Sequence, residues 1–183
     1  WPAEIPASLY FSPGHGENGM GRFMRVVDYF WVDSPAWRGS GWRLVTPFLK
    51  SGTLETLAGL VHMCGLSPED VDGIYRRRFR GVLMALKEMH TRGYTHDDVK
   101  TDNIFVAENG EFLLGDLGNV REHEHGYHSH APDMHTGHKD YRQGDTERAV
   151  RSYLTFLRFA CGDQRVFDRD FREMRAEWSE FFW

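Results

Sequence analysis

The order of apolar and polar positions predicts a short β region followed by several helices. Residues 23–32 and 42–49 are rich in β-branched and aromatic side chains, which is typical of strands. Asp33-Ser34-Pro35 and Gly39-Ser40-Gly41 lie between these two runs and supply the residue types that turns prefer. We therefore expect an antiparallel pair of strands in the first third of the chain.

The longest helical pattern begins after Ser67. This residue is a good N-cap, and Pro68 occupies the first helical position. Apolar side chains then recur every three to five residues from Val71 to Met89, and Gly93 is a suitable C-terminal stop. The pattern predicts one long helix whose apolar stripe packs against a larger core. Further helices are expected over residues 53–63, 145–160 and 168–182.

A β-hairpin is expected directly after this long helix. The apolar runs 104–106 and 112–114 flank Asn109-Gly110, and Asn-Gly between apolar runs is a strong hairpin signal. Residues 119–144 are polar and lack a period, which predicts a long loop.

Residues 1–22 are rich in glycine and proline. Their clustered glycines are compatible with a phosphate-binding loop, but such a loop needs a strand before it and a strand or helix after it. The flanking residues show neither pattern, so a flexible lead-in is the favoured interpretation.

Composition narrows the class of protein. The 183 residues are 40% hydrophobic and 27% charged, which suits one globular domain or two small lobes. The net charge of −5 argues against a nucleic-acid partner, and no apolar run reaches the length of a membrane span. Cys64 and Cys161 form no disulfide framework, so we expect a reducing compartment, the cytoplasm or the nucleus.

The residues around the predicted hairpin carry the candidate chemistry. Phosphoryl transfer requires a carboxylate that orients the attacking hydroxyl, cations on the phosphates and oxygen ligands for Mg²⁺. Asp98, Lys100 and Asn103 precede the hairpin, and Asp116 follows it. Because a tight hairpin returns the chain to its starting point, we expect these four side chains to lie close together.

The order His96-Asp97-Asp98-Val99-Lys100-Thr101-Asp102-Asn103, followed by Asp116-Leu117-Gly118, resembles the catalytic loop and the Asp-Phe-Gly motif of protein kinases. The resemblance runs from about residue 24 to about residue 160 and is sharpest over 93–118. It implies an α+β fold with a mainly helical C-terminal lobe, a catalytic-loop hairpin and a remnant two-stranded N-terminal lobe. The corresponding boundaries are 1–22 for the lead-in, 23–49 for the remnant lobe with its hinge, and 50–183 for the C-terminal lobe.

The resemblance also implies roles for the four polar residues. Asp98 would orient the substrate hydroxyl, and Lys100 would steady the γ-phosphate. Asn103 and Asp116 would ligate Mg²⁺, which prefers such oxygen ligands. His96 would pack structurally beneath the Asp-Leu-Gly motif.

A nucleotide-binding hinge is implied farther upstream. Thr46, Pro47 and Leu49 would line the site of the adenine ring, and Phe105 would lie beneath it. Pro47 has no N–H to donate, which removes one possible hinge contact. A plain apolar strand and an ordinary core phenylalanine remain the alternative interpretation.

Three features depart from the pattern that the resemblance implies. The first lysine of the chain is Lys50, so no lysine precedes the hinge to hold the α- and β-phosphates. Either the protein lacks this half of the upper lobe, or the sequence is part of a longer chain. Asp97 stands where the family usually has arginine, and an aspartate would repel a phosphate on the activation segment. Activation by phosphorylation of that segment is therefore not expected.

The third departure is a short activation segment. Ala131-Pro132-Asp133 aligns with the Ala-Pro-Glu motif, and Asp145 then corresponds to the helix acid that braces the catalytic loop. Six histidines over 123–138 are compatible with a transition-metal site, although a solvated, pH-sensitive loop is the simpler interpretation.

The sequence thus predicts an ATP- and Mg²⁺-dependent protein-kinase-like domain that phosphorylates a Ser/Thr-type hydroxyl of a protein or peptide. A pseudokinase that acts as a binding or regulatory module is the main alternative. A small-molecule kinase of the aminoglycoside phosphotransferase type is a third possibility, but Lys100 favours the protein-kinase branch. The oligomeric state is not indicated.

Overall fold

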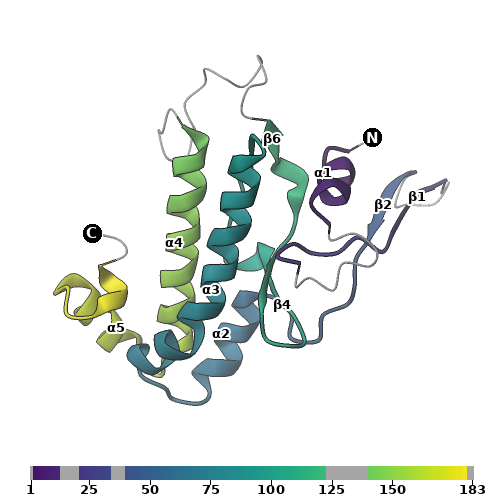
Figure 1. Ribbon diagram of the computed structural model, residues 1–183. Coiled ribbons are helices and arrows are strands. Elements are labelled where there is room, and N and C mark those ends of the chain that lie inside the picture. The colour runs from purple at the N-terminus through teal and green to yellow at the C-terminus, as the bar shows by residue number, and fades with distance from the viewer. Residues whose placement is uncertain (1, 13–20, 34–39, 123–139, 181–183) are drawn as a thin grey trace.

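The computed structural model describes residues 2–12, 21–33, 40–122 and 140–180 (Figure 1). Two long helices, α3 (Pro68–Thr91) and α4 (Tyr141–Ala160), run side by side and form the centre of the helical body. The smaller elements are α1 (Glu4–Phe11), β1 (Asp28–Val32), β2 (Gly41–Val45), α2 (Leu54–His62), β3 (Tyr94–Thr95), η1 (Thr101–Asn103), β4 (Ile104–Val106), β5 (Phe112–Leu114), η2 (Leu117–Asn119), β6 (Arg121–Glu122), α5 (Gln164–Arg172) and η3 (Glu177–Ser179). The described chain is therefore mainly helical with short strand pairs, in agreement with the predicted α+β class.

The predicted antiparallel pair near the N-terminus is present but shorter than expected. β1 pairs with β2 so that Asp28 faces Val45 and Val32 faces Gly41. Phe23 and Met24 do not extend this pair, because they bond instead to the end of the hairpin. Phe23 forms a parallel bridge with Leu114, and the Met24 N–H donates to the Leu114 carbonyl at 2.8 Å.

The predicted N-cap and C-terminal stop of α3 are confirmed. The Ser67 hydroxyl accepts a hydrogen bond from the Asp70 N–H at the start of α3. Thr53, which was not predicted as a cap, accepts in the same way from the Thr56 N–H at the start of α2. Gly93 has a φ of +84° just after α3, a conformation that glycine adopts without steric cost. Local sequence signals therefore determine where both helices begin and where α3 ends.

The hairpin at residues 104–114 is also confirmed. β4 pairs with β5 so that Ile104 faces Leu114, and Gly110 supplies the positive φ of the turn. A side chain at Gly115 would place its Cβ only 2.7 Å from the Phe105 ring, so the chain can leave the hairpin at this point only with glycine. The hairpin and Gly115 consequently determine where the backbone of Asp116 lies.

Three helices differ from the prediction. Where the sequence predicts an irregular lead-in over residues 1–22, the structure contains α1, which is held by long-range packing of Phe11 against Phe23 and Tyr94. α4 begins at Tyr141 rather than at residue 145, because Asp140 caps it.

The last predicted helix is shifted as well. α5 covers Gln164–Arg172 instead of residues 168–182 and is capped by Asp163. It ends where Met174 adopts a left-handed conformation, with a φ of +49°. Trp178 then folds back and stacks on Phe167, with 4.3 Å between the ring centroids.

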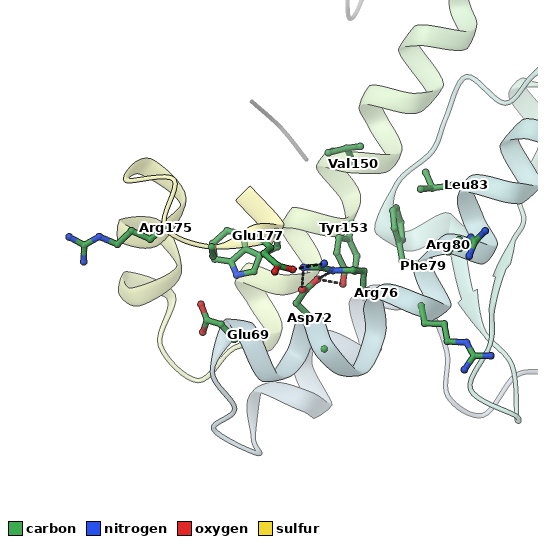
Figure 2. A pocket seen from close by; sticks show the side chains of 14 residues that line it. Glu69, Asp72, Arg76, Phe79, Arg80, Leu83, Val150, Tyr153, Arg175 and Glu177 are labelled. Atoms are coloured by element: carbon green, nitrogen blue, oxygen red, sulfur yellow. Dashed lines mark hydrogen bonds and ion pairs between the residues drawn. The ribbon is translucent and has the colours of Figure 1, made fainter. Parts of the chain in front are cut away.

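An open groove of about 890 Å³ lies between α3, α4 and the segment around Trp178. Figure 2 shows Asp72 in its wall, with Arg76 and Tyr153 directed toward the carboxylate. The Tyr153 hydroxyl donates to Asp72 at 2.7 Å, and Arg76 donates to both carboxylate oxygens. Burial and the Asp72 hydrogen bond raise the pKa of Tyr153, so its hydroxyl stays a donor.

Replacing the Tyr153 hydroxyl tests how much this network stabilises the fold. Tyr153→Phe removes one hydrogen bond to a buried carboxylate, and we expect it to lower the free energy of unfolding by about 1–3 kcal/mol. Tyr10→Phe is the matched control, because the Tyr10 hydroxyl makes no hydrogen bond with the part of the chain that the structure describes. Urea unfolding of both variants measures the difference, and equal effects would contradict the prediction.

Candidate functional site

One buried carboxylate organises the loop that carries the candidate chemistry. Asp145 lies in the second turn of α4, and its side chain is 0% exposed. It accepts hydrogen bonds from the backbone N–H groups of His96 and Asp97, each at 2.8 Å. The Nε2 atom of His90, at the end of α3, lies 3.0 Å from the same carboxylate. Asp145 therefore braces the loop as predicted, by joining it to both central helices.

His96 links the two halves of the site. The Asp98 N–H donates to His96 Nδ1 at 3.2 Å, so the ring proton belongs on Nε2, which lies 3.1 Å from the Gly115 carbonyl. Burial lowers the pKa of His96, although the charge of Asp145 opposes this shift. A neutral, fully buried His96 thus connects the loop of residues 96–103 to the residue before Asp116, in the structural role that was expected.

Three of the predicted site residues meet at one carboxylate oxygen. Oδ2 of Asp98 accepts from Lys100 Nζ at 2.8 Å and from Asn103 Nδ2 at 3.1 Å. The hydrogen bond to Asp98 is the largest cause of the raised pKa of Lys100. Asn119 Nδ2 also lies 3.4 Å from this oxygen. Asn119 was not identified from the sequence, because its approach depends on the path of the chain after Asp116.

Asp116 is delivered to the same region. The Gly115 N–H donates to the Asn103 carbonyl at 2.9 Å, so the residue before Asp116 is bonded directly to Asn103. Asp116 itself is exposed and has a φ of +55°, a left-handed conformation that often occurs at functional sites in non-glycine residues. Its negative charge contributes to the raised pKa of Lys100, as a smaller cause than the Asp98 hydrogen bond.

The side-chain oxygen atoms of Asn103 and Asp116 suit a hard cation. The Asn103 amide nitrogen donates to Asp98, while its amide oxygen has no hydrogen bond within the described residues. Together with the exposed Asp116 carboxylate it offers the oxygen ligands that Mg²⁺ prefers. No group of three or more His, Cys, Asp or Glu side chains is arranged for a metal in the described ranges, and the histidines of residues 123–138 lie outside those ranges.

The predicted hinge residues follow β2. Thr46 is exposed, whereas Pro47 and Leu49 are half-buried. The end of this segment is attached to β4, because the Gly52 carbonyl accepts from the Val106 N–H at 2.9 Å and Thr53 forms a bridge with Phe105. The segment that follows the predicted hinge residues is thus paired through its backbone with the strand that carries Phe105.

A second carboxylate near Asp116 was missed by the sequence analysis. Glu4 lies on α1, which packs against η2 directly after Asp116. Burial raises the pKa of Glu4, and the negative charge of Asp116 raises it further. No local pattern marks Glu4, since its position results from the packing of α1.

Comparisons with known proteins point to protein kinases. No profile of a protein family matches the chain. It is 31% identical over 87 residues to serine/threonine-protein kinase STE20 of Kluyveromyces lactis, covering 48% of this chain and 8% of that protein. It is 48% identical over 48 residues to eIF-2-alpha kinase GCN2 of Schizosaccharomyces pombe, covering 26% and 3%.

A bacterial protein gives a similar result. Serine/threonine-protein kinase PknL of Mycobacterium tuberculosis is 35% identical over 78 residues, covering 43% of this chain and 18% of that protein. The chain therefore spans less than a fifth of the length of each of these relatives. The matches support a protein-kinase-like relationship for part of the chain.

Within the described residues, no helix is long and apolar enough to cross a bilayer.

The buried His96 predicts a pH dependence of stability. Its pKa is lowered in the folded state, so below its ordinary value of 6.5 the unfolded chain binds a proton that the folded chain resists. Its contribution to stability is complete above pH 6.5 and is lost as the pH falls toward the folded-state pKa, with a slope of at most about 1.4 kcal/mol per pH unit. Urea unfolding between pH 5.5 and 7.5 measures this slope.

Variants assign that slope to His96. His96→Gln should flatten it, because glutamine does not titrate. His62→Gln, at an exposed position on α2, should leave it in place. A slope that survives in His96→Gln would show that other groups cause it.

Proposed function

We propose that the chain is the C-terminal lobe, with a remnant of the N-terminal lobe, of an ATP- and Mg²⁺-dependent protein-kinase-like phosphotransferase. The reaction transfers the γ-phosphate to a Ser/Thr-type hydroxyl of a protein or peptide. The observation that supports this most strongly is the junction at Asp98, where Lys100 and Asn103 meet one carboxylate oxygen next to the path of Asp116. In this proposal residues 23–49 form the remnant lobe and 50–183 the C-terminal lobe.

Each residue has a role that its surroundings support. Asp98 orients the attacking hydroxyl and accepts its proton, because hydrogen bonds hold the carboxylate at the centre of the cluster. Lys100, whose side chain is 47% exposed, can turn from Asp98 to the γ-phosphate. Asn103 and Asp116 hold Mg²⁺, which neutralises charge on the phosphates when it is bound.

The adenine base has a separate set of proposed contacts. In the proposal Thr46, Pro47 and Leu49 line the adenine ring, with Phe105 beneath it. The backbone contacts between residues 52–53 and 105–106 support this placement, because they attach the segment after Leu49 to the strand that carries Phe105.

A binding module without catalysis is the second candidate. The observation that favours it is the crowding of Asp98, whose Oδ2 is approached by Lys100, Asn103 and Asn119 together. A carboxylate oxygen that keeps all three donors leaves no room for a substrate hydroxyl. Nucleotide binding and phosphoryl transfer must therefore be measured separately.

Nucleotide binding is tested by thermal shift with ATP, with and without Mg²⁺. Binding to the folded state alone should stabilise the protein by about 2.7 kcal/mol when the ligand is 100-fold above its Kd. Asp116→Asn should abolish the Mg²⁺-dependent part of the shift. Glu108→Gln removes an exposed carboxylate in the hairpin turn and should leave it unchanged. No shift at millimolar ATP and Mg²⁺, or an equal shift in Asp116→Asn, would contradict the proposal.

Transfer is tested with radiolabelled ATP and a degenerate Ser/Thr peptide mixture. Asp98→Asn should keep Mg²⁺-dependent ATP binding but lower the transfer rate by about 100-fold or more, since it cannot accept the hydroxyl proton. If the unaltered protein binds ATP but transfers no phosphate, the binding-module candidate is supported instead.

A further inference from the structure

Asp97 provides an interaction that the proposed reaction does not use. Its side chain is 4% exposed, and its carboxylate lies 2.7 Å from Nε of Arg121 and 3.9 Å from a terminal nitrogen of Arg148. Its backbone has a φ of +63°, and its N–H donates to Asp145. The backbone of Asp97 is thus held in a left-handed conformation, and its buried carboxylate faces two guanidinium groups.

The two arginines come from different parts of the chain. Arg121 lies in β6, shortly after Asp116, and pairs with Thr95 of β3. The ion pair with Asp97 therefore joins β6 to the residue two positions beyond Thr95, its partner in β3. Arg121 also stacks over the Tyr141 ring at the start of α4, 5.1 Å from its centroid. Arg148 is 14% exposed and belongs to α4 itself.

Among the described residues, two carboxylates and two guanidinium groups meet in this cluster. The carboxylates of Asp97 and Asp145 face the guanidinium groups of Arg121 and Arg148, and Arg148 lies 3.7 Å from Asp145. Removing one cation would leave a buried carboxylate without compensation, which is strongly unfavourable. A phosphate placed here would add negative charge beside two carboxylates that already engage both guanidinium groups, which is unfavourable.

We infer that Asp97 and Arg121 form a built-in ion pair that fastens the segment after Asp116 to the catalytic loop without phosphorylation. The inference rests on the proposed function, because its consequence is the position of Asp116 at the Mg²⁺–ATP site. Asp97 and Arg121 are positioning residues. Their ion pair holds the chain that follows Asp116, while the contact between His96 and Gly115 holds the chain that precedes it. The side chain at position 97 is thus negative, whereas the kinase resemblance implies a positive one.

The test compares Asp97→Asn, Arg121→Gln and the double variant. Two quantities are measured: hydrogen exchange of peptides covering residues 94–98 and 116–122 without nucleotide, and the Kd for ATP in excess Mg²⁺. Each single variant should accelerate exchange in both peptides and raise the Kd by about tenfold. The double variant should be no worse than the poorer single variant, because the second change removes a partner whose interaction is already lost.

Two further variants separate positioning from general damage. Arg121→Lys keeps the charge and should restore most of the affinity. Arg151→Gln removes an exposed arginine that pairs with Glu147 on α4 and should change neither quantity. Phosphatase treatment of the unaltered protein should leave its Kd within about twofold, since no phosphate takes part in the pair. A large loss after that treatment would overturn the inference.

The remaining outcomes distinguish this inference from the proposed function. Unchanged exchange in Arg121→Gln overturns the ion pair as a fastening element, whether or not the protein binds ATP. Faster exchange with an unchanged Kd, while Asp116→Asn abolishes binding, overturns the positioning role and leaves the proposed function in place. If the unaltered protein binds no ATP, the proposed function fails, and with it the positioning role of the pair.

Discussion

A buried carboxylate must be compensated by hydrogen bonds or by charge, and the requirements of Asp145 determine the geometry of the site. Burying an ionised carboxylate costs several kcal/mol unless its oxygens are satisfied. Asp145 meets this condition by accepting the N–H groups of His96 and Asp97 and by contacting the His90 ring. Since these donors belong to the loop of residues 96–103 and to α3, neither element can move relative to α4 without leaving the carboxylate unsatisfied.

The three successive residues of the loop that Asp145 holds, at positions 96–98, each contact a different part of the chain. His96 reaches the Gly115 carbonyl after the hairpin, and Asp97 pairs with Arg121 of β6. Asp98 collects Lys100 and Asn103 from its own loop. The left-handed backbone of Asp97 lets its neighbours serve different partners. The chemistry proposed for Asp98 and Asp116 therefore depends on supporting groups that have no proposed contact with the nucleotide.

Much of this arrangement could be predicted from the sequence, because its signals are local. The Ser67 cap, Gly93 and the Asn109-Gly110 turn act within a few residues, and the spacing of Asp98, Asn103 and Asp116 follows from the hairpin between them. α1 could not be predicted, since it is held by contacts of Phe11 with distant aromatic rings. Asn119 and Arg121 were missed for the same reason: their partners are set by the return of the chain from the hairpin, not by any period.

The central claim is that Asp145 holds the loop of residues 96–103 in place, and hydrogen exchange at individual amides tests it most directly. The N–H groups of His96 and Asp97 should be strongly protected in the unaltered protein. In Asp145→Asn only one oxygen remains to accept them, so at least one of the two amides should exchange about tenfold faster or more, while amides in the middle of α3 keep their rates. If both loop amides exchange as slowly in Asp145→Asn as in the unaltered protein, the carboxylate does not hold the loop and the account is wrong.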